Sequence, residues 1–473
     1  MSTWHGPHRR AAQRQRGAAA LIVVMVLLFL VSLTAAYTNR NLIFEQRTSA
    51  NQYRGTLAFE AADAGVEWSL AMLNGGVISG ACDDASPTKS FAQRYLAIAA
   101  DGKVTHPVRN GNWPTCVFDG TDWSICTCPD DTALAPTPPT GSGIFPAFRV
   151  WLAAPGPAAV PATPESQLLN RPGLVSVQSH GCTRLPTSSG DRCLDFEPQA
   201  EVGDGLARVR AVLALRSGLP TPPAAAVTAR LGVNPAASPA LPLRVVNTHE
   251  PSGGLTVLSG GAVDASRVAA QTLPGTPGEF SIVAGDARLA ALATTAPATT
   301  PPAPPALSAG DRMFVATFGV KRETYREQPG LRVCASPCSA AAINALLANN
   351  PDRVIWVEGN LTLDASVGDP TTTTPVLLIV DGDTLALDPG VELYGFVYLV
   401  GDTTVAATAT VALNGGAASI RGALVAEGTL QTSTTSSADE LAVNYDAVAL
   451  NVLRTRYGSW VRVGGSWRDF RSP

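Results

Sequence analysis

A long apolar run near the N-terminus dominates the pattern of hydrophobic and polar positions. It extends from Ala18 to Asn39, and the next charged residue is Arg40. At about 1.5 Å per helical residue, this run is long enough to cross a bilayer. Basic residues precede it, so the start is predicted to stay in the cytoplasm and the rest of the chain to lie outside; these residues are Arg9, Arg10, Arg14 and Arg16.

The helical pattern continues beyond the apolar run. Apolar residues recur at spacings of three and four, which places them on one helix face; they are Phe59, Ala62, Val66, Leu70 and Leu73. No proline occurs between Gly17 and Gly80, and Asn74-Gly75-Gly76 supplies a stop signal. The pattern therefore predicts one helix over residues 18–74, about 57 residues and roughly 85 Å long.

Three segments of this helix carry a family resemblance. They are residues 15–24 (QRGAAALIVV), 45–51 (EQRTSAN) and 58–67 (AFEAADAGVE). Together they resemble the N-terminal region of type IV pilins, and among these the PilX-like minor pilins. The resemblance implies that a prepilin peptidase cleaves after Gly17 at the cytoplasmic face. It also implies methylation of the new N-terminus, Ala18.

Two positions depart from the usual pilin pattern. Pilins usually begin the mature chain with Phe and carry Glu as the fifth residue, whereas this chain has Ala18 and Ile22 there. A buried carboxylate needs a positive partner, which in a pilus is the N-terminal amine of the neighbouring subunit. Ile22 lacks the carboxylate for this contact. The departure indicates a minor or tip subunit rather than the repeated major subunit.

The resemblance also implies a function and a location. The chain is expected to enter a type IV pilus, or the related type II secretion pseudopilus, through its helix, with Ile22, Phe59, Val66 and Leu70 on the filament-core helix. Implied partners are other minor pilins, the major pilin, the assembly platform and a tip adhesin. Before assembly the protein is expected in the inner membrane as a single-pass protein with its bulk in the periplasm, and afterwards in the cell-surface pilus. No catalysis and no cofactor are implied.

Two other interpretations of the apolar run remain open. A cleaved secretory signal also combines a basic start with an apolar run, and Thr34-Ala35-Ala36 is a possible small-residue cleavage site. The length of the run and the helical pattern that continues through this site favour an uncleaved helix there. A plain membrane anchor for an unrelated periplasmic domain is the second alternative.

Charge argues against a nucleic-acid partner. Only 15% of the 473 residues are charged and the formal net charge is -4. No Lys/Arg stripe occurs outside the N-terminal leader, and such a stripe is the usual mark of nucleic-acid binding.

Eight cysteines follow the helix and are predicted to form disulfides in an oxidising periplasm. Cys182 with Cys193 and Cys334 with Cys338 are local pairs, which leaves Cys82, Cys116, Cys126 and Cys128 to pair among themselves. The spacing of Cys126-Thr127-Cys128 does not fit a zinc site and no nearby histidine completes one, so no metal is expected there.

The remaining chain alternates short apolar runs with turns, which predicts an α+β protein with a β-rich, disulfide-stapled head packed on the outer half of the helix. Expected strands lie at residues 148–152, 173–177, 207–213, 243–246, 254–258 and 280–283. The expected divisions are a leader (1–17), a pilin helix (18–75), the head (76–218), Gly/Pro-rich strands and linkers (219–308), and a C-terminal domain (309–473).

A loose repeat marks the C-terminal domain. Four apolar runs each end in a turn glycine, Gly359, Gly382, Gly401 or Gly428, at intervals of 23, 19 and 27 residues. Such spacing predicts the rungs of a β-solenoid, with a β-sandwich as the alternative. Residues 339–350 are predicted to form a short amphipathic helix that ends at Pro351.

No catalytic motif or phosphate-binding loop is present, and the five histidines are scattered. Asp381, Asp383 and Asp388 form a weak calcium candidate, although their spacing fits no defined loop. Tyr394, Phe396 and Tyr398 share one strand face. They are expected to pack under the helix at 339–350, with a stacking surface for sugar as the alternative.

The competing hypothesis from another class is a membrane-tethered β-solenoid enzyme acting on polysaccharide, or an adhesin of that architecture. Such enzymes generally need clustered carboxylates or basic residues on one solenoid face. The repeat region is poor in both, so assembly is favoured over turnover.

Overall fold

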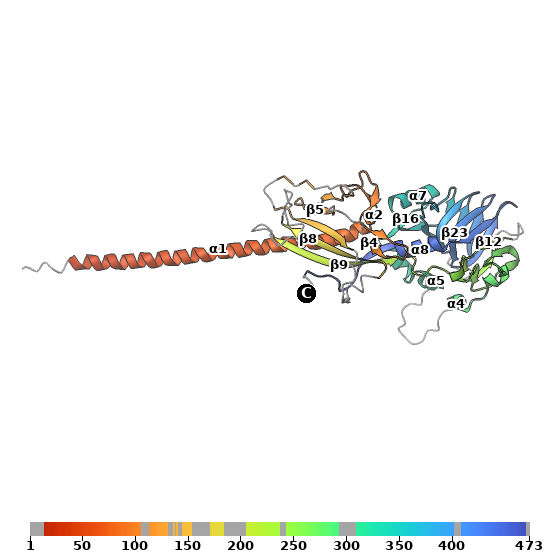
Figure 1. Cartoon of the computed structure of the whole chain (residues 1–473), viewed down its shortest axis with the longest axis horizontal. Helices are drawn as coiled ribbons and strands as arrows, with labels where there is room; N and C mark the ends of the chain where they lie inside the picture. The colour runs from red at the N-terminus through yellow and green to blue at the C-terminus, as the bar shows by residue number, and fades with distance from the viewer. Residues whose placement is uncertain are drawn as a thin grey trace, which may run out of the picture.

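The computed structural model describes residues 14–105, 113–130, 136–137, 139–140, 144–153, 171–183, 205–236, 243–292, 309–401 and 408–469. A single helix, α1 (Arg14–Leu73), runs from the N-terminal end into a β-rich head, and a second β-rich body lies beyond the end of this helix (Figure 1). The predicted long helix is confirmed. It begins before Ala18 and ends immediately before the Asn74-Gly75-Gly76 stop.

The head is built on an antiparallel sheet with strand order β26-β9-β8-β7-β5-β6. Its strands are β5 (Thr115–Val117), β6 (Ile125–Thr127), β7 (Ala147–Ala153), β8 (Leu174–Cys182), β9 (Leu206–Ser217) and β26 (Gly458–Arg462). The strands expected at 148–152, 173–177 and 207–213 are confirmed as β7, β8 and β9. The edge strand β26 comes from the end of the chain, so the head contains residues that the sequence analysis placed in the C-terminal domain.

Two short hairpins and a helix lie beside this sheet. They are β1 (Val77–Ile78) paired with β2 (Lys89–Ser90), β3 (Ala97–Ile98) paired with β4 (Val104–Thr105), and α2 (Phe91–Tyr95). Ser90 begins α2 through a capping box: its hydroxyl accepts from the backbone N–H of Gln93, and the Gln93 side chain accepts from the N–H of Ser90. Phe91 and Tyr95 are thereby directed into the head core, where both are fully buried.

The C-terminal body contains two sheets of parallel strands, and the chain alternates between them. One sheet holds β16 (Leu331–Cys334), β17 (Val354–Glu358), β19 (Val376–Asp381), β21 (Glu392–Leu399), β23 (Ala418–Ala426) and β25 (Leu441–Tyr445). The other holds β18 (Leu361–Leu363), β20 (Thr384–Leu387), β22 (Thr408–Leu413) and β24 (Thr429–Thr434). Inward-facing Val, Leu and Ile side chains of both sheets form one buried core.

The repeat glycines lie at the turns between the two sheets. Gly359 and Gly401 have positive φ values of 78° and 75°, a conformation that glycine adopts without strain. A Cβ added to Gly382 would lie 2.5 Å from the carbonyl oxygen of Gly359. Successive turns therefore stack closely, which explains why glycine recurs at these places in the sequence.

The middle of the chain extends the same two sheets. Its strands are β10 (Val227–Ala229), β11 (Gly232–Asn234), β12 (Leu243–Val246), β13 (Val257–Ser259), β14 (Val268–Gln271) and β15 (Ile282–Val283). β10 pairs with β23, β11 with β24 and β12 with β25, all in parallel. The boundary drawn at residue 309 thus separates strands that share sheets.

Two expected strands of this region differ in extent from the structure. The run at 254–258 forms a strand only at Val257–Ser259, because Gly253 and Gly254 both have positive φ. Residues 280–281 belong to the 3₁₀ helix η3 (Gly278–Ser281), and only Ile282–Val283 pair as a strand. Two further 3₁₀ turns, η1 (Glu250–Ser252) and η2 (Ala265–Arg267), and the short helix α4 (Ala287–Ala291) complete this part.

Helices cover the outer face of the larger sheet. They are α5 (Ala309–Phe318), α6 (Arg322–Arg326) and α8 (Ala447–Arg456). Phe314 of α5 contacts the ring of Tyr398 with centroids 5.5 Å apart, and Phe396 joins the same buried cluster. The helix predicted at 339–350 is confirmed as α7 (Ala340–Asn349), capped by Ser339.

The prediction that the strand aromatics pack under α7 is wrong. Ile343 of α7 packs into the core between the two sheets, whereas Phe396 and Tyr398 point to the opposite face of β21. This follows from the alternation of side chains along the strand, since their neighbour Val397 points into the inter-sheet core. Tyr394, Phe396 and Tyr398 are all buried, so none offers a stacking surface to a sugar.

Candidate functional site

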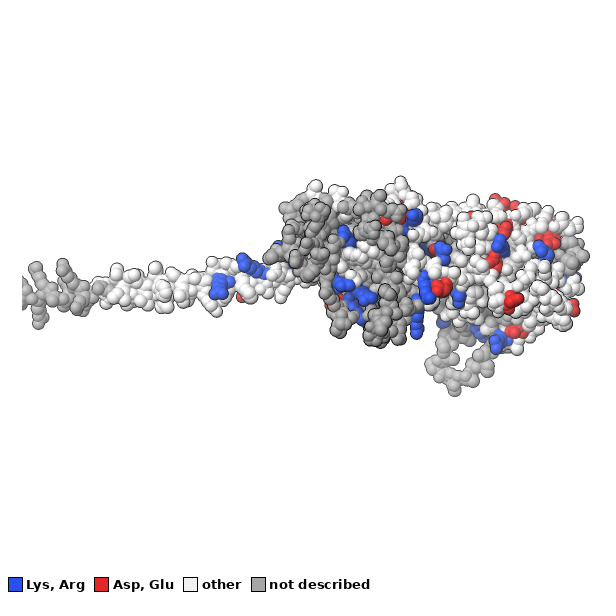
Figure 2. Space-filling model, in the orientation of Figure 1, with Lys and Arg blue, Asp and Glu red and all other residues white. Residues whose placement is uncertain are grey.

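Helix α1 has two halves with different surroundings. Every described side chain from Ala19 to Tyr53 is exposed, whereas residues from Ala58 onward pack on the head. Figure 2 shows the outer part of the helix as uncharged, with charged atoms appearing close to the head. Within the described residues, one helix is long and apolar enough to cross a membrane, with a mean hydropathy of 2.8 in its most apolar window. The first half is thus an apolar surface that the protein itself does not cover.

The cleavage and core positions predicted from the sequence lie on this helix. Gly17 has open space around it, and Ile22 is 61% exposed within the apolar stretch. Ala18 belongs to α1, but its side chain lies outside the described residues, as do residues 1–13 of the leader.

Three of the four residues named on the filament-core helix lie in its outer half, on which the head is expected to pack. Val66 is buried against the head, and Phe59 and Leu70 are half-buried in the same cluster. This contact agrees with the expected packing of the head on the outer half of the helix. Of these four positions, Ile22 is the one left exposed for contact with neighbouring subunits.

Small residues bring α1 very close to the head sheet. A Cβ on Gly181 of β8 would lie 2.0 Å from the carbonyl oxygen of Ala58 and 2.5 Å from the nitrogen of Ala62. A Cβ on Gly65 of α1 would lie 2.1 Å from the hydroxyl of Ser179. Because the atoms nearest to a Cβ at position 181 belong to the backbone of α1, the helix can approach β8 this closely only with glycine at that position.

The end of α1 is tied to the last strand of the chain. The side-chain amide of Asn74 donates to the carbonyl of Trp460 in β26 at 2.9 Å, and the N–H of Trp460 donates to Asn74 Oδ1 at 2.9 Å. Asn74 also donates to the carbonyl of Leu70 at 3.0 Å. The Asn74 side chain thus adds a second hydrogen bond to the Leu70 carbonyl, which also accepts from the backbone N–H of Asn74, and it holds the edge of β26.

Arginines from the C-terminal body complete this junction. Arg353 donates to the carbonyls of Leu73 at 2.6 Å, Gly75 at 3.0 Å and Gly458 at 3.2 Å. Arg332 donates to the carbonyl of Asn74 at 2.9 Å. Positive charge at a helix C-terminus is favourable because the helix dipole is negative there.

Arg353 keeps its charge at neutral pH although it is buried. Burial lowers its pKa to about 10, and the nearby Arg332 charge acts in the same direction. Three carbonyl acceptors replace part of the water that the guanidinium loses, while its Nε is buried without a partner. The junction is therefore a buried, charge-assisted contact between the helix, the head and the body.

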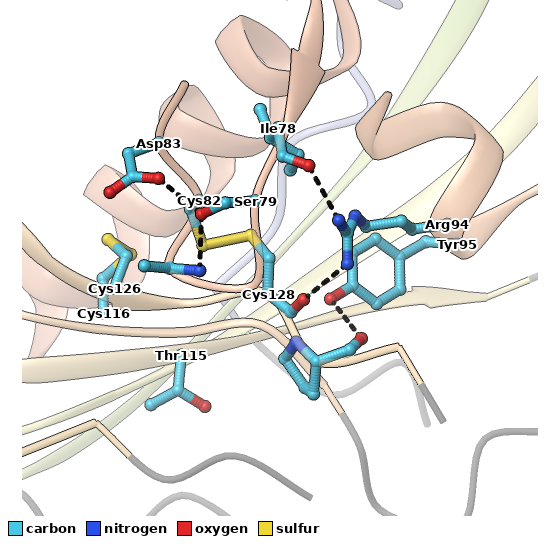
Figure 3. The surroundings of a disulfide bond; sticks show 12 residues. Ile78, Ser79, Cys82, Asp83, Arg94, Tyr95, Thr115, Cys116, Cys126 and Cys128 are labelled. Carbon is cyan, nitrogen blue, oxygen red and sulfur yellow. Dashed lines mark hydrogen bonds between the residues drawn. A yellow bond between two sulfur atoms is a disulfide. The ribbon is translucent and has the colours of Figure 1, made fainter. Parts of the chain in front are cut away.

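A disulfide anchors the loop that follows α1. Cys82 pairs with Cys128, and beside this bridge Arg94 donates to the carbonyls of Ile78 at 2.7 Å and Cys128 at 3.2 Å (Figure 3). The hydroxyl of Tyr95 donates to the carbonyl of Pro129 at 2.9 Å. Helix α2 thus holds Cys128 and the strand β1 that precedes Cys82.

The other cysteines largely pair as predicted. Cys116 bonds Cys126 across β5 and β6, so the group of four does pair within itself. Cys334 bonds Cys338, as predicted for a local pair. Cys182 is disulfide-bonded, and Cys193, its predicted partner, lies outside the described residues.

The buried carboxylate of Glu427 is held by structural contacts. Arg322 Nη2 lies 2.7 and 2.8 Å from the two oxygens of Glu427, and the hydroxyl of Tyr398 donates to Glu427 Oε1 at 2.8 Å. Burial raises the pKa of Glu427, while Arg322 opposes that rise. These contacts link α6 to the turn between β23 and β24 and use both carboxylate oxygens.

The remaining candidates do not come together. Asp381 ends β19, Asp383 accepts from the hydroxyl of Thr384, and Asp388 accepts from Asn414. In the part of the chain that the structure describes, no group of three or more His, Cys, Asp or Glu side chains is placed to hold a metal ion.

The histidines are equally dispersed. His180 lies in β8 against the ring of Trp151, and His249 lies near Tyr445. His5, His8 and His106 fall outside the described residues.

These features define a class of protein in which one long helix is anchored in a disulfide-bonded head by its second half, while its apolar first half is exposed. Residues 16–67 match the family model described as the PilX N-terminal region. The match assigns this segment to that family and confirms the resemblance seen in its residues. The segment is thus similar to the N-terminal region of PilX-like type IV pilins.

Other comparisons add little. A search of curated proteins gives no match. The crystal structure of the competence-associated pilin ComZ from Thermus thermophilus aligns with 12% identity over 89% of this chain and 97% of that chain, with a TM-score of 0.18. At that score the alignment carries no argument about fold or function.

Sequence reasoning missed the junction at the end of α1. The sequence around Asn74 indicates only a helix stop, and nothing near Arg353 or Trp460 in the sequence points to α1. In the structure, the positive φ of 62° at Asp352 marks a sharp turn just before Arg353, which no residue pattern indicates. Its meaning depends on contacts with residues far away in the chain.

Proposed function

We propose that this protein is a minor pilin that serves in the assembly and initiation of a type IV pilus, at the filament tip, without catalytic turnover. The observation that carries the proposal is the exposed apolar half of α1 within a segment that matches the PilX N-terminal region. Such a surface is stable in a bilayer before assembly and against the apolar helices of other pilins afterwards.

Processing and topology follow from the same segment. The leader is cut after Gly17, Ala18 becomes the methylated N-terminus, and the head and body lie on the periplasmic side. Basic residues before the apolar run and disulfides after it support this orientation. The partners in the filament are other minor pilins, the major pilin and a tip adhesin, and in the membrane the assembly platform.

Two observations support a place at the tip. The C-terminal body lies beyond the end of α1, and its Arg353 contacts the last carbonyls of that helix (Figure 1). In a filament of stacked parallel helices, a body in this place occupies the volume that the next subunit needs. Ile22 also lacks the carboxylate that would pair with the amine of a subunit added above.

We also propose that the C-terminal body is a β-solenoid. The support is the parallel pairing of strands one turn apart, such as β17 with β19 and β18 with β20, with the chain passing between the two sheets at each turn. A solenoid with aromatic side chains covered by helices gives the tip a stiff, extended end.

Copy number and position in sheared filaments test the proposal. Quantitative mass spectrometry is expected to give a small fraction of the major pilin, and gold labelling is expected only at filament ends. Deletion of the gene should reduce pilus number sharply. Labelling along the shaft at near-equal stoichiometry would contradict the tip position, and detection only in a short pseudopilus would move the protein to the secretion system.

A further inference from the structure

A cavity of about 430 Å³ opens in the head beside the disulfides. Trp68 of α1 and Trp123 of the segment before β6 lie on its wall, together with Cys82, Asp83 and Thr127. Nothing in the proposed assembly role uses this cavity.

Several polar groups of the wall have no partner. The indole N–H groups of Trp68 and Trp123 make no hydrogen bond among the described residues. Thr127 is 8% exposed, and its hydroxyl is buried without a partner. Asp83 Oδ1 accepts from the Ser79 hydroxyl and the Ala85 N–H, while Oδ2 accepts from no described residue. An unpaired buried hydroxyl such as that of Thr127 is costly and calls for an explanation. Asp83 is exposed and both Trp side chains are half-buried, so their unpaired polar atoms are open to a ligand.

The two indole rings are held in place by their neighbours. Trp68 packs on Phe148 with ring centroids 5.5 Å apart and stands edge-on to Phe91 at 5.3 Å. Trp123 packs on the same Phe148 at 4.8 Å. A ligand that uses these rings meets a surface that is already ordered, which reduces the entropic cost of binding.

We propose that this cavity binds a neutral saccharide. A sugar has hydroxyls that accept from indole N–H groups, hydroxyls that donate to Asp83 Oδ2, and C–H faces that pack on indole rings. An anion is disfavoured because no Lys or Arg occurs among the described lining residues, whereas Asp83 contributes a negative charge. An organic cation would use Asp83 and the rings and would leave both indole donors unpaired.

The test uses the full-length chain in a detergent without a sugar headgroup. Saturation-transfer NMR and calorimetry are run with glucose, galactose, mannose and N-acetylglucosamine, and with choline as the organic cation. At least one sugar is expected to bind and choline to bind less. Trp123→Phe and Asp83→Asn should each weaken sugar binding at least tenfold.

Matched controls separate the site from general damage. Trp467→Phe removes another indole N–H, one that donates to Asp63, and Asp369→Asn alters another exposed hydrogen-bonded carboxylate; both should bind sugar as the native chain does. Unchanged disulfide maps check the fold of each variant. The inference is overturned if no sugar binds, if choline binds more tightly than every sugar, or if both cavity variants bind like the controls. It stands independently of the pilus, because filament assembly is not part of the readout.

Discussion

Asn74 and Trp460 exchange hydrogen bonds as two strand residues would, although one ends the first helix and the other lies in the last strand. The side-chain amide of Asn74 both donates and accepts at 2.9 Å. Arg353 reaches the same point from the C-terminal body. The helix, the head and the body therefore meet at one place, and the body is joined directly to the end of α1.

Replacing Arg353 should loosen this junction. Arg353→Met keeps the length of the side chain but removes the donors to Leu73, Gly75 and Gly458, so we expect a loss of about 3 kcal/mol in the free energy of unfolding. Urea unfolding of the full chain in detergent measures it. The control is Arg244→Met, which removes a surface ion pair with Glu440 and should cost less than about 1 kcal/mol. If the two variants have the same free energy of unfolding, the contacts of Arg353 do not contribute to stability as proposed.

Processing should depend on Gly17. Gly17→Arg is expected to block cleavage, because the residue before the cut is replaced by a large charged one, and to keep the protein in the inner membrane. Mass analysis of the native membrane form should give a chain that begins at Ala18 with a methylated amine. A start near Tyr37 would instead identify a secretory signal and would rule out entry into a filament through α1.

The disulfides should differ in their contribution to stability. Cys82 and Cys128 are separated by 46 residues and Cys334 and Cys338 by 4. Because a longer closed loop restricts the unfolded chain more, replacing the first pair with Ser should cost about 4 kcal/mol and the second about 2 kcal/mol. Thermal or urea unfolding of the two double variants gives the comparison. Peptide mapping without reductant should recover both bridges together with Cys116–Cys126, and free thiols at these positions would contradict the pairing.

Gly181 should tolerate no side chain. Gly181→Ala places a Cβ 2.0 Å from the carbonyl oxygen of Ala58, so α1 must move away from β8, at an expected cost of about 1 to 3 kcal/mol. Gly464→Ala is the control, since nothing lies within 4 Å of its Cβ. Hydrogen exchange in the buried half of α1 should rise in the first variant only. Equal protection in both would show that the helix does not depend on this close contact.

The turn at Asp119 should loosen in acid. The Thr121 hydroxyl, with the N–H groups of Asp122 and Thr121 and the Ser124 hydroxyl, holds the pKa of Asp119 well below its ordinary value of 3.8. A carboxyl whose folded pKa is depressed adds stability above its unfolded pKa, and this is lost as pH falls through the folded value. Amide exchange at Thr121 and Asp122 should therefore rise below about pH 3.8, and in Asp119→Asn it should not respond to this titration. The same acid response in the variant would assign the effect to another group.

The sequence predicts those features of this protein that depend on neighbouring residues. The extent of α1 follows from the spacing of Phe59, Val66 and Leu70 and from the stop at Asn74. The local disulfide Cys334–Cys338 follows from proximity in the chain. Strand positions β7 to β9 follow from short apolar runs between turns.

Long-range relationships could not be predicted in this way. Val227 of β10 pairs with Leu424 of β23 in parallel, and no residue pattern near either position predicts this pairing. The alternation of side chains along β21 predicts the face on which Tyr398 lies. It does not predict which helix covers that face, because the sequence offers both α5 and α7 as candidates. The cavity wall could not be predicted either, because Trp68 and Trp123 are far apart in the sequence and are brought together by packing on Phe148.

The order of strands in the C-terminal body has a consequence for how the protein is made. Synthesis proceeds from the N-terminus, so β10 and β12 leave the ribosome well before β23 and β25, on which they stack. Until then, β10 has only β13 and β12 only β14 as a parallel partner, and the other edge of each strand stays open. The non-local pairings with β23 and β25 form slowly. The edge of β9 likewise waits for β26. A chain that terminates early therefore leaves open edges in the head sheet and in the larger sheet of the body. The complete fold forms only after the last strands have been synthesised.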